Sequence, residues 1–261
     1  MTYFVSAVSS VVFTQFSDCH LYADKSALHF GQPVYANLVR TLGDMREMKD
    51  LQFAVFTGDL SQDHSDQSYR NFNEAISESG IQVPIYWLPG NHDSIEQMQN
   101  LLVHPLLNDD KDIVLDGLRL MLLNSKSATP AGLLADTELA RLQDIDKTDA
   151  TLLFMHHHPR PVGYFIDRHG LQNASAFWLL LQHLPGVVGV ACGHVHRAIT
   201  QNADKNASAP VYCCPATSIQ FDPEFDGVKA LPEGPAYRTF YYDNGELSSR
   251  IVRLPVANPT I

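Results

Sequence analysis

The fold of this chain is decided by the stretch Val83-Pro84-Ile85-Tyr86-Trp87-Leu88-Pro89-Gly90-Asn91-His92-Asp93, in which a short apolar run ends in a polar cluster. The same pattern occurs at four other places. The apolar runs 11–17, 52–57, 151–155 and 187–192 end, in that order, at Asp18-Cys19-His20, Gly58-Asp59, His156-His157-His158 and Gly193-His194-Val195-His196. Short apolar runs bounded by Gly and Pro are typical of strands that are buried on both faces. The chain is therefore predicted to contain five such strands.

Helical patterns lie between these runs, at residues 33–49, 65–79, 136–146 and 172–184, where apolar side chains recur on one face. The alternation of strands and helices indicates an α/β fold. Two further apolar runs, 113–115 and 118–123, flank Asp116-Gly117, which predicts a hairpin. Strands are also expected at 211–221, 237–243 and 246–254, the last two joined at Asn244-Gly245. No domain boundary is evident, so residues 1–261 are expected to form one domain.

The composition narrows the classes of partner. The formal net charge is −11, and only 18% of the residues are charged. A protein that coats duplex DNA, or that is held on anionic lipid by charge, needs the opposite sign. The cysteines form no C-x-x-C pair, and the apolar N-terminus up to Phe16 carries no basic residue and is too short to span a bilayer. We therefore expect a cytoplasmic protein whose partners include neither a membrane nor a nucleic-acid polymer.

Oxygen and imidazole donors follow the five predicted strands directly. If the strands are parallel neighbours, their carboxyl ends share one crevice, where open α/β sheets bind ligands. The side chains that meet there would be Asp18, His20, Asp59, Asn91, His156, His194 and His196. Glycines precede three of the donor clusters, at positions 58, 90 and 193, where the missing side chain permits close backbone approach.

This donor set is too large for one ion and suits two ions that share Asp59. One ion would be held by Asp18, His20, Asp59 and His196, and the other by Asp59, Asn91, His156 and His194. Two metals roughly 3.5–4 Å apart generate a hydroxide nucleophile and stabilise the attacking and leaving oxygens of an in-line displacement. The donor set therefore predicts phosphoester hydrolysis by metal-bound hydroxide.

His92 follows the predicted ligand Asn91 directly and is expected to lie near the same site. We predict that it protonates the leaving alkoxide, which is typically worth ~10²–10⁴ in rate. Asp93 is predicted to hold the other ring nitrogen of His92. His20, Asn91 and His196 are expected to contact the substrate as well as the metals.

The five polar clusters, in this order, resemble the signature blocks of the calcineurin-like metallophosphoesterase superfamily, and they span residues 18–196. Segments 57–63, 87–93, 171–174 and 215–221 add a closer likeness to the bacterial class III 3′,5′-cyclic-AMP phosphodiesterases. The resemblance implies a two-sheet β-sandwich flanked by helices, in α/β/β/α layers. It also implies hydrolysis of 3′,5′-cyclic AMP to 5′-AMP with two divalent ions, iron, manganese or similar.

Some residue assignments stay open. His158 points to the same side of a strand as His156, and the ungapped match of residues 156–161 to the family pattern favours His156. Phe221 and Tyr22 are candidates for stacking on adenine, and His169 is a candidate for the pocket wall. The remaining histidines are expected to lie at the surface as ordinary side chains: His29, His64, His104 and His183.

Two other functions are compatible with the same residues. A phosphodiesterase of broader specificity, acting on glycerophosphodiesters or 2′,3′-cyclic nucleotides, would share every metal ligand. A non-catalytic scaffold on the same fold is the second alternative, although it has no need of a complete ligand set. A homodimer is also left open.

Overall fold

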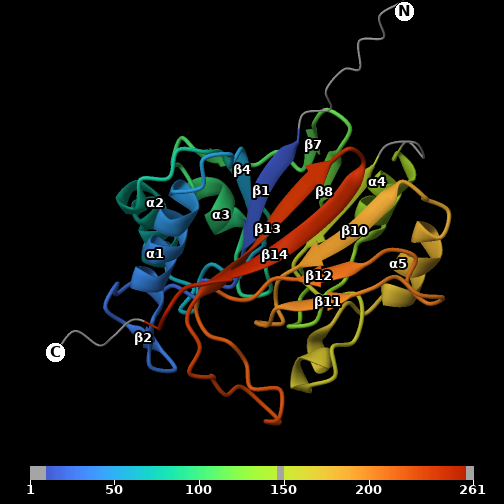
Figure 1. Ribbon diagram of the computed structural model, residues 1–261. Coiled ribbons are helices and arrows are strands. Elements are labelled where there is room, and N and C mark those ends of the chain that lie inside the picture. The colour runs from blue at the N-terminus through green and yellow to red at the C-terminus, as the bar shows by residue number, and fades with distance from the viewer. Residues whose placement is uncertain (1–9, 146–149, 257–261) are drawn as a thin grey trace, which may run out of the picture.

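Two six-stranded sheets form the centre of the computed structural model, which describes residues 10–145 and 150–256 (Figure 1). The strands of the first sheet follow one another in the order β14 (Glu246–Arg253), β13 (Ala236–Asp243), β1 (Val11–Phe16), β4 (Phe53–Phe56), β5 (Ile85–Trp87) and β6 (Leu107–Asn108). The order in the second sheet is β11 (Ile199–Gln201), β12 (Val211–Cys213), β10 (Val187–Cys192), β9 (Thr151–Met155), β8 (Arg119–Leu122) and β7 (Asp112–Val114). A separate short hairpin consists of β2 (Leu28–His29) and β3 (Gln32–Pro33).

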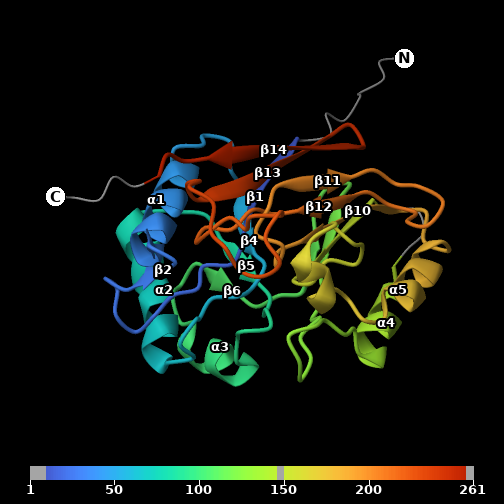
Figure 2. The ribbon, with the colours of Figure 1, turned by 90° about the horizontal axis from the view of Figure 1, so that it is seen from below.

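Helices cover the outer face of each sheet (Figure 2). On one side, α1 (Val34–Arg46), α2 (Asp66–Ser79) and α3 (Ile95–Leu101) share a core cluster with β1, β4 and β5. On the other side, α4 (Asp136–Gln143) and α5 (Ala174–Leu181) share a core cluster with β9 and β10. The layers are therefore α/β/β/α, which confirms the helix-flanked sandwich that the resemblance implied.

A third core cluster lies between the two sheets. Phe13 of β1 stacks on Phe53 of β4 and on Phe240 of β13, with ring centroids 4.9 and 5.1 Å apart. Phe154 of β9, in the opposite sheet, meets the edge of Phe13 at 6.3 Å. Each buried Phe contributes roughly 1.5–3 kcal/mol relative to exposure. This packing fixes the two sheets against each other and so fixes the positions of their strand ends.

Local signals set the ends of several elements. The Ser65 hydroxyl accepts the backbone N–H of Ser68 and caps α2, and Gly80 ends that helix with a φ of 70°. Asn244 and Gly245 join β13 to β14 with φ values of 50° and 85°, the conformation that two-residue hairpins favour. The helix expected at 65–79 and this hairpin are thus confirmed.

The strand arrangement differs from the open sheet that the alternation of elements suggested. β1, β4 and β5 are parallel neighbours, and so are β9 and β10, but the two groups belong to different sheets. The strand expected at 211–221 ends at Cys213, because the next segment bonds to a loop of the site, with the Thr217 N–H donating to the Ser17 carbonyl. Helix α3 and strand β11 are too short to produce a detectable period.

The structure covers only part of two predicted elements. Residues 1–9 of the apolar N-terminus and residue 146 of the expected helix 136–146 lie outside the described residues. No helix in the described part of the chain is both long enough and apolar enough to cross a membrane.

Candidate metal centre

The carboxyl ends of strands from both sheets meet at one edge of the sandwich. The Asp18 N–H donates to the Gly58 carbonyl at 2.9 Å, and the His194 N–H donates to the Asp18 carboxylate at 3.1 Å. These bonds join β1 to β4 within the first sheet and to β10 of the second. All seven predicted ligands come together here. Asn91 is half-buried. The other six are buried: Asp18, His20, Asp59, His156, His194 and His196.

Asp59 has one group of donors on its β9 side. Its Oδ2 lies 3.3 Å from Nε2 of His156. The same Nε2 lies 3.0 Å from Oδ1 of Asn91 and 3.2 Å from Nδ1 of His194. These four residues are the predicted ligand set of one of the two ions.

A second group of donors lies on the other side of Asp59. Its Oδ2 is 3.8 Å from Nε2 of His20, and that nitrogen is 3.2 Å from Nε2 of His196. Nε2 of His196 is also 3.4 Å from Oδ1 of Asp18. Asp59 therefore lies between two clusters, as the predicted bridging role requires.

The donor set fits bound cations because its lone pairs face one another. Two of the rings donate a hydrogen bond from Nδ1 to a backbone carbonyl. His156 donates to the Thr57 carbonyl at 2.7 Å, and His196 donates to the Ile219 carbonyl at 2.9 Å. In neutral rings both Nε2 atoms then carry lone pairs that point at the acceptors of the cluster. Nε2 of His194 is buried and has no hydrogen-bond partner among the residues that the structure describes. Lone pairs at such distances repel unless a proton or a cation lies between them.

Burial and charge prepare these groups for metal binding. Burial lowers the pKa of His20 and of His194 well below the usual range, so both rings remain neutral and keep a free lone pair. Burial alone would raise the pKa of Asp59. The charge and the hydrogen bond of His156, with smaller effects of the charges of His92 and His20, outweigh burial and hold this pKa well below its usual value. Burial alone would lower the pKa of His156, but the Asp59 carboxylate outweighs it and raises this pKa to about 9.

Metal binding is expected to expel a proton from His156. Below about pH 9 the ring is protonated in the metal-free protein, and the proton occupies the lone pair that a cation needs. The apparent affinity for Mn²⁺ should therefore rise by up to about tenfold per pH unit between about pH 6.5 and 8.5. Calorimetric titration with Mn²⁺ at several pH values, in buffers of different ionisation enthalpy, measures the affinity and the proton release. An affinity independent of pH, without proton release, would contradict the displacement.

The backbone at five of the ligands adopts a conformation that is rare for residues with side chains. The φ values lie between 49° and 67° at Asp18, His20, Asp59, His194 and His196. This left-handed region costs an L-residue roughly 1–2 kcal/mol. Such strain persists where surrounding contacts enforce it, which is typical of functional sites.

Asp93 enforces the conformation of the Asp59 loop. Its carboxylate accepts four backbone N–H groups at 2.8–3.3 Å, those of Asp59, Leu60, Ser61 and Gly90. Nδ1 of His92 is buried and has no hydrogen-bond partner in the described part of the chain. The prediction that Asp93 holds His92 is therefore wrong, because its oxygens are already occupied by the backbone. Asp93 is instead a positioning residue for Asp59.

Gly90 allows the β5 loop to pass directly beside Asp59. A Cβ atom at position 90 would lie 2.1 Å from Oδ1 of Asp59 and 2.4 Å from its backbone N. A Cβ atom on Gly58 would likewise lie 2.3 Å from the backbone N of Gly90. The close backbone approach predicted at these glycines is confirmed.

Gly90→Ala is expected to displace Asp59 and to lower the free energy of unfolding by about 1–3 kcal/mol, the usual cost of overpacking. Bound metal per chain should fall with it, because the displaced carboxylate no longer lies between the two donor groups. Urea unfolding and elemental analysis measure the two effects.

Gly43→Ala is the matched control for this substitution. Gly43 lies in α1, and a Cβ atom there would approach only the Ser79 carbonyl oxygen, at 4.0 Å. Alanine is the better helix former, so this variant should keep its metal and be unchanged or slightly more stable. If the two alanine variants were equally stable and equally loaded with metal, the close packing at Gly90 would be unimportant.

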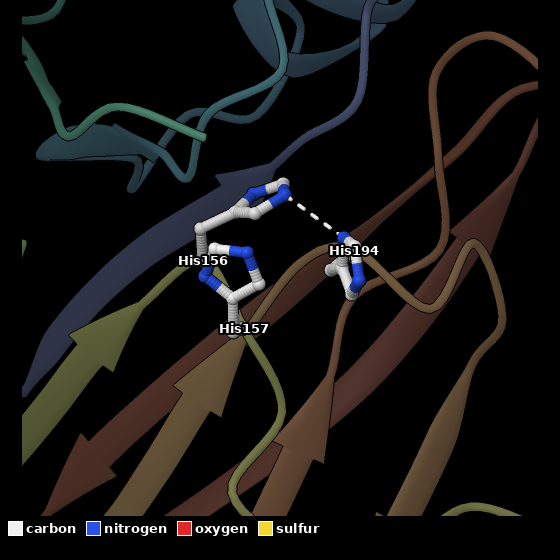
Figure 3. Close-up of side chains that lie close together, drawn as sticks. All are labelled: His156, His157 and His194. Carbon is white, nitrogen blue, oxygen red and sulfur yellow. Dashed lines mark hydrogen bonds between the residues drawn. The ribbon is translucent and has the colours of Figure 1, made fainter. Parts of the chain in front are cut away.

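The consecutive histidines after β9 have different surroundings. Figure 3 shows two of them beside the histidine that follows β10: His156, His157 and His194. Nε2 of His156 faces Nδ1 of His194, the contact drawn as a dashed line in Figure 3. Both nitrogens of His157 are instead bonded to the loop 125–131, at Ser125 and Pro130. Nε2 of His158 lies 3.1 Å from the Asp167 carboxylate. The geometry thus favours His156 over His158 as the ligand.

His29 lies in a place that the sequence did not predict. We expected this residue at the surface, but it is only 8% exposed. Its ring stacks on that of His20, with the ring centroids 5.1 Å apart and an angle of 3° between the ring planes. Nδ1 of His29 is 3.0 Å from the Tyr22 hydroxyl. Burial lowers the pKa of His29 to about 4, with smaller effects of His196 and His92. The expectation fails because the β2–β3 hairpin brings this ring against the ligand, a tertiary contact without a sequence signal.

The other predicted surface histidines agree better with the structure. His64 and His183 are exposed, and His104 is half-buried. Nδ1 of His64 lies 2.9 Å from the His92 carbonyl, and the two rings stack with centroids 5.9 Å apart. His64 is therefore at the surface but adjoins the proposed acid.

A pocket of about 210 Å³ opens onto the candidate ligands. Its inner end is lined by candidate ligands and by the half-buried His92: His20, Asp59, Asn91, His92, His194 and His196. We call the remaining lining residues the outer wall: Pro130, Phe165, Ile166, His169, Phe221 and Val228. A larger hollow, of about 610 Å³, lies between segment 159–161 and α5, but no candidate ligand lines it. The smaller pocket is therefore the candidate active site.

The two aromatic residues considered for stacking on adenine are placed differently. Phe221 lines the pocket, but it is 6% exposed and stacks on His196 with centroids 4.0 Å apart, which leaves little ring surface for a base. Tyr22 is not among the described residues that line the pocket. His169 does line it, as considered from the sequence.

The chain belongs to the calcineurin-like phosphoesterase family, whose pattern matches residues 11–198 and so includes all seven candidate ligands. It is 44% identical over 250 residues to a probable cyclic nucleotide phosphodiesterase of Colwellia psychrerythraea, a match that covers 94% of this chain and 95% of that protein. Its identity to the 3′,5′-cyclic adenosine monophosphate phosphodiesterase CpdA is 31% for the Vibrio vulnificus protein, over 94% of this chain and 91% of that one. For the Escherichia coli K12 protein the identity is 30%, and the match covers 92% of this chain and 88% of that protein.

Solved structures show the same fold. A dimetal phosphatase from Danio rerio superposes with a TM-score of 0.71 at 13% identity, covering 97% of this chain and all of that one (100%). A purple acid phosphatase from yellow lupin superposes with a TM-score of 0.60 at 13% identity, covering 94% of this chain and 52% of that one. These likenesses confirm the fold, and the family makes the protein a hydrolase of phosphoesters.

Proposed function

We propose that this protein hydrolyses 3′,5′-cyclic AMP to 5′-AMP with two bound divalent cations. The proposal is carried by the position of Asp59, which lies between two groups of buried donors at the inner end of one pocket. Relatives that match along nearly the whole chain are named cyclic nucleotide or cyclic AMP phosphodiesterases. Iron and manganese are the proposed metals, and the same N/O donors also suit cobalt and zinc.

The charge of the site suits an anionic phosphodiester. Two divalent cations would add four positive charges, and the carboxylates of Asp18 and Asp59 would cancel two of them. Asn91 contributes a neutral oxygen, so it leaves this positive charge in place. The substrate would thus be attracted locally although the chain as a whole has a net charge of −11.

The side chains of the pocket divide the remaining work. Bound cations supply Lewis-acid polarisation of the phosphate and activation of a water molecule. His92 lines the pocket, and its Nδ1 has no hydrogen-bond partner among the described residues. We assign to His92 the proton donated to the departing O3′ of the ribose. His20, Asn91 and His196 line the same inner end and are the proposed contacts of the phosphate.

A substrate panel at fixed Mn²⁺ tests the function. It contains 3′,5′-cyclic AMP, 3′,5′-cyclic GMP, 2′,3′-cyclic AMP, glycerophosphocholine and a simple aryl phosphodiester. The 3′,5′-cyclic nucleotides are expected to exceed the other natural diesters in kcat/KM by at least about tenfold, with 5′-AMP as the product of cyclic AMP. A cyclic AMP rate no better than that of the aryl diester would favour the broader phosphodiesterase.

Metal analysis separates the enzyme from a scaffold. A scaffold has no use for a cluster of buried carboxylates and imidazoles, whereas the proposed enzyme should hold about two ions per chain in Mn²⁺. Less than about one ion per chain under these conditions would favour the scaffold. The cytoplasmic location, the single domain and the homodimer stay predictions.

A further inference from the structure

We propose that the outer wall of the pocket is the subsite for the base of the substrate. Phe165, Ile166, His169 and Val228 are among the residues that line it. This inference rests on the proposed function, because it assigns a base to the substrate. It concerns residues that the metal chemistry does not use.

The two ends of the pocket differ in chemistry. The inner end is a cluster of metal-binding groups, whereas His169 is the only polar side chain among the described residues of the outer wall. Ile166 is buried, Phe165 is half-buried and Val228 is 41% exposed. A cyclic nucleotide has the same division, with an anionic phosphate at one end and a flat, uncharged base at the other. Apolar walls with few polar groups are typical of sites for such rings.

Only the ring of Phe221 separates Phe165 of the outer wall from the candidate ligand His196. Phe221 stacks on His196 with centroids 4.0 Å apart, and Phe165 packs against Phe221 with centroids 5.1 Å apart. A substrate whose phosphate lies at the ligands therefore has apolar surface within reach. In a 3′,5′-cyclic nucleotide the phosphate is fused to the ribose, so the base cannot extend far from the metals.

The two segments that line the subsite are in contact. Phe165 and Ile166 belong to the 3₁₀ helix Phe165–His169, and Val228 belongs to the loop 222–230. The ends of this loop are joined by the Asp222 N–H, which donates to the Lys229 carbonyl at 2.9 Å. An ion pair between Arg168 and Asp226 connects the 3₁₀ helix with the loop. The pair is exposed and contributes little energy, but it shows that the loop lies beside the 3₁₀ helix.

This construction predicts weak discrimination between purines. Adenine and guanine differ in the polar groups at positions 1, 2 and 6 of the ring. An apolar wall does not strongly reject such a difference, whereas a site that hydrogen-bonds the base edge discriminates by 10⁴–10⁵. The kcat/KM values for cyclic AMP and cyclic GMP are therefore expected to differ by less than about 100-fold.

The double variant Phe165→Ala/Val228→Ser tests the subsite. It removes apolar surface without adding charge, and it should lower kcat/KM for cyclic AMP about tenfold more than kcat/KM for methyl p-nitrophenyl phosphate, which has no base. Val228→Ser alone, on an exposed loop, should give a smaller shift in the same direction and covers the case that the double variant folds poorly. The inhibition constant of 5′-AMP should rise more than that of inorganic phosphate, a readout that needs no turnover of the nucleotide.

Phe225→Ser is the matched control. Phe225 lies on the same loop and is 48% exposed, but it does not line the pocket. Its substitution should change the ratio of the two kcat/KM values less than about twofold.

The outcomes separate this inference from the proposed function. If the wild-type protein hydrolyses the aryl ester but no cyclic nucleotide, the proposed function fails and the subsite fails with it. If it hydrolyses cyclic AMP, three results overturn the subsite alone. These are equal losses for the two substrates, an equal effect of Phe225→Ser, or discrimination between cyclic AMP and cyclic GMP above about 10⁴.

Discussion

Asp59→Asn is expected to abolish turnover, with kcat lower by at least about 10³-fold, and to remove most of the bound metal. The substitution keeps the size of the side chain and one acceptor oxygen, which can still receive the His92 N–H now bonded to Oδ1 at 2.9 Å. It replaces the other oxygen, which faces both His156 and His20, by an amide that cannot bridge two cations. Elemental analysis of the purified protein and steady-state rates with cyclic AMP measure the two losses.

Asp63→Asn is the control for removing one carboxylate from this segment. Asp63 is exposed, and its oxygens accept the N–H groups of Ala23 and Ser65 outside the pocket. This variant should keep its metal and a rate within about threefold of the wild type, because asparagine can still accept hydrogen bonds. An Asp59→Asn protein with full metal and a rate near that of Asp63→Asn would refute the bridging role.

His92→Ala is expected to keep its metal but to lose about 10²–10⁴-fold in kcat for cyclic AMP, the usual contribution of a general acid. The loss should be much smaller for a p-nitrophenyl diester, because p-nitrophenolate leaves without protonation. His92 could alternatively act as a ligand, since its ring lies close to His20 and Asp59. Metal analysis decides this point, because loss of a ligand removes metal and slows both substrates alike.

His64→Ala controls for the loss of an imidazole beside the pocket. His64 is exposed and stacks on His92, but it is not among the described residues that line the pocket. Its removal should leave the rate for cyclic AMP within about fivefold of the wild type. Equal losses in the two variants would mean that the stack, and not proton transfer from His92, accounts for the effect.

The positions of the candidate metal ligands could be predicted from the sequence because each lies just after an apolar run. A strand that is buried on both faces must end where polar residues begin, and parallel strands end at the same edge of a sheet. Correct strand ends were therefore enough to predict the positions of two pairs, Asp18 with His20 and His194 with His196. The hairpin at Asn244-Gly245 was equally accessible, because its turn conformation is encoded in two adjacent residues.

The contacts that support the ligands could not be predicted in this way. Asp93 bonds to N–H groups of Asp59, Leu60 and Ser61, which are more than thirty residues away in the chain. His29 packs on His20 because of the path of a short hairpin. Neither contact is marked in the sequence by a hydrophobic period or by a motif, since the partners meet only after the sheets have packed.

The sequence by itself determined which side chains could bind metal and which apolar segments had to become strands, since both depend on residue type and on short-range spacing. Only the tertiary structure decided that these strands divide between two sheets, that Asp93 holds the Asp59 loop and that Phe165 and Val228 face one pocket. The physical reason is that burial constrains each strand separately, whereas the pairing of strands and the path of loops depend on contacts between distant residues.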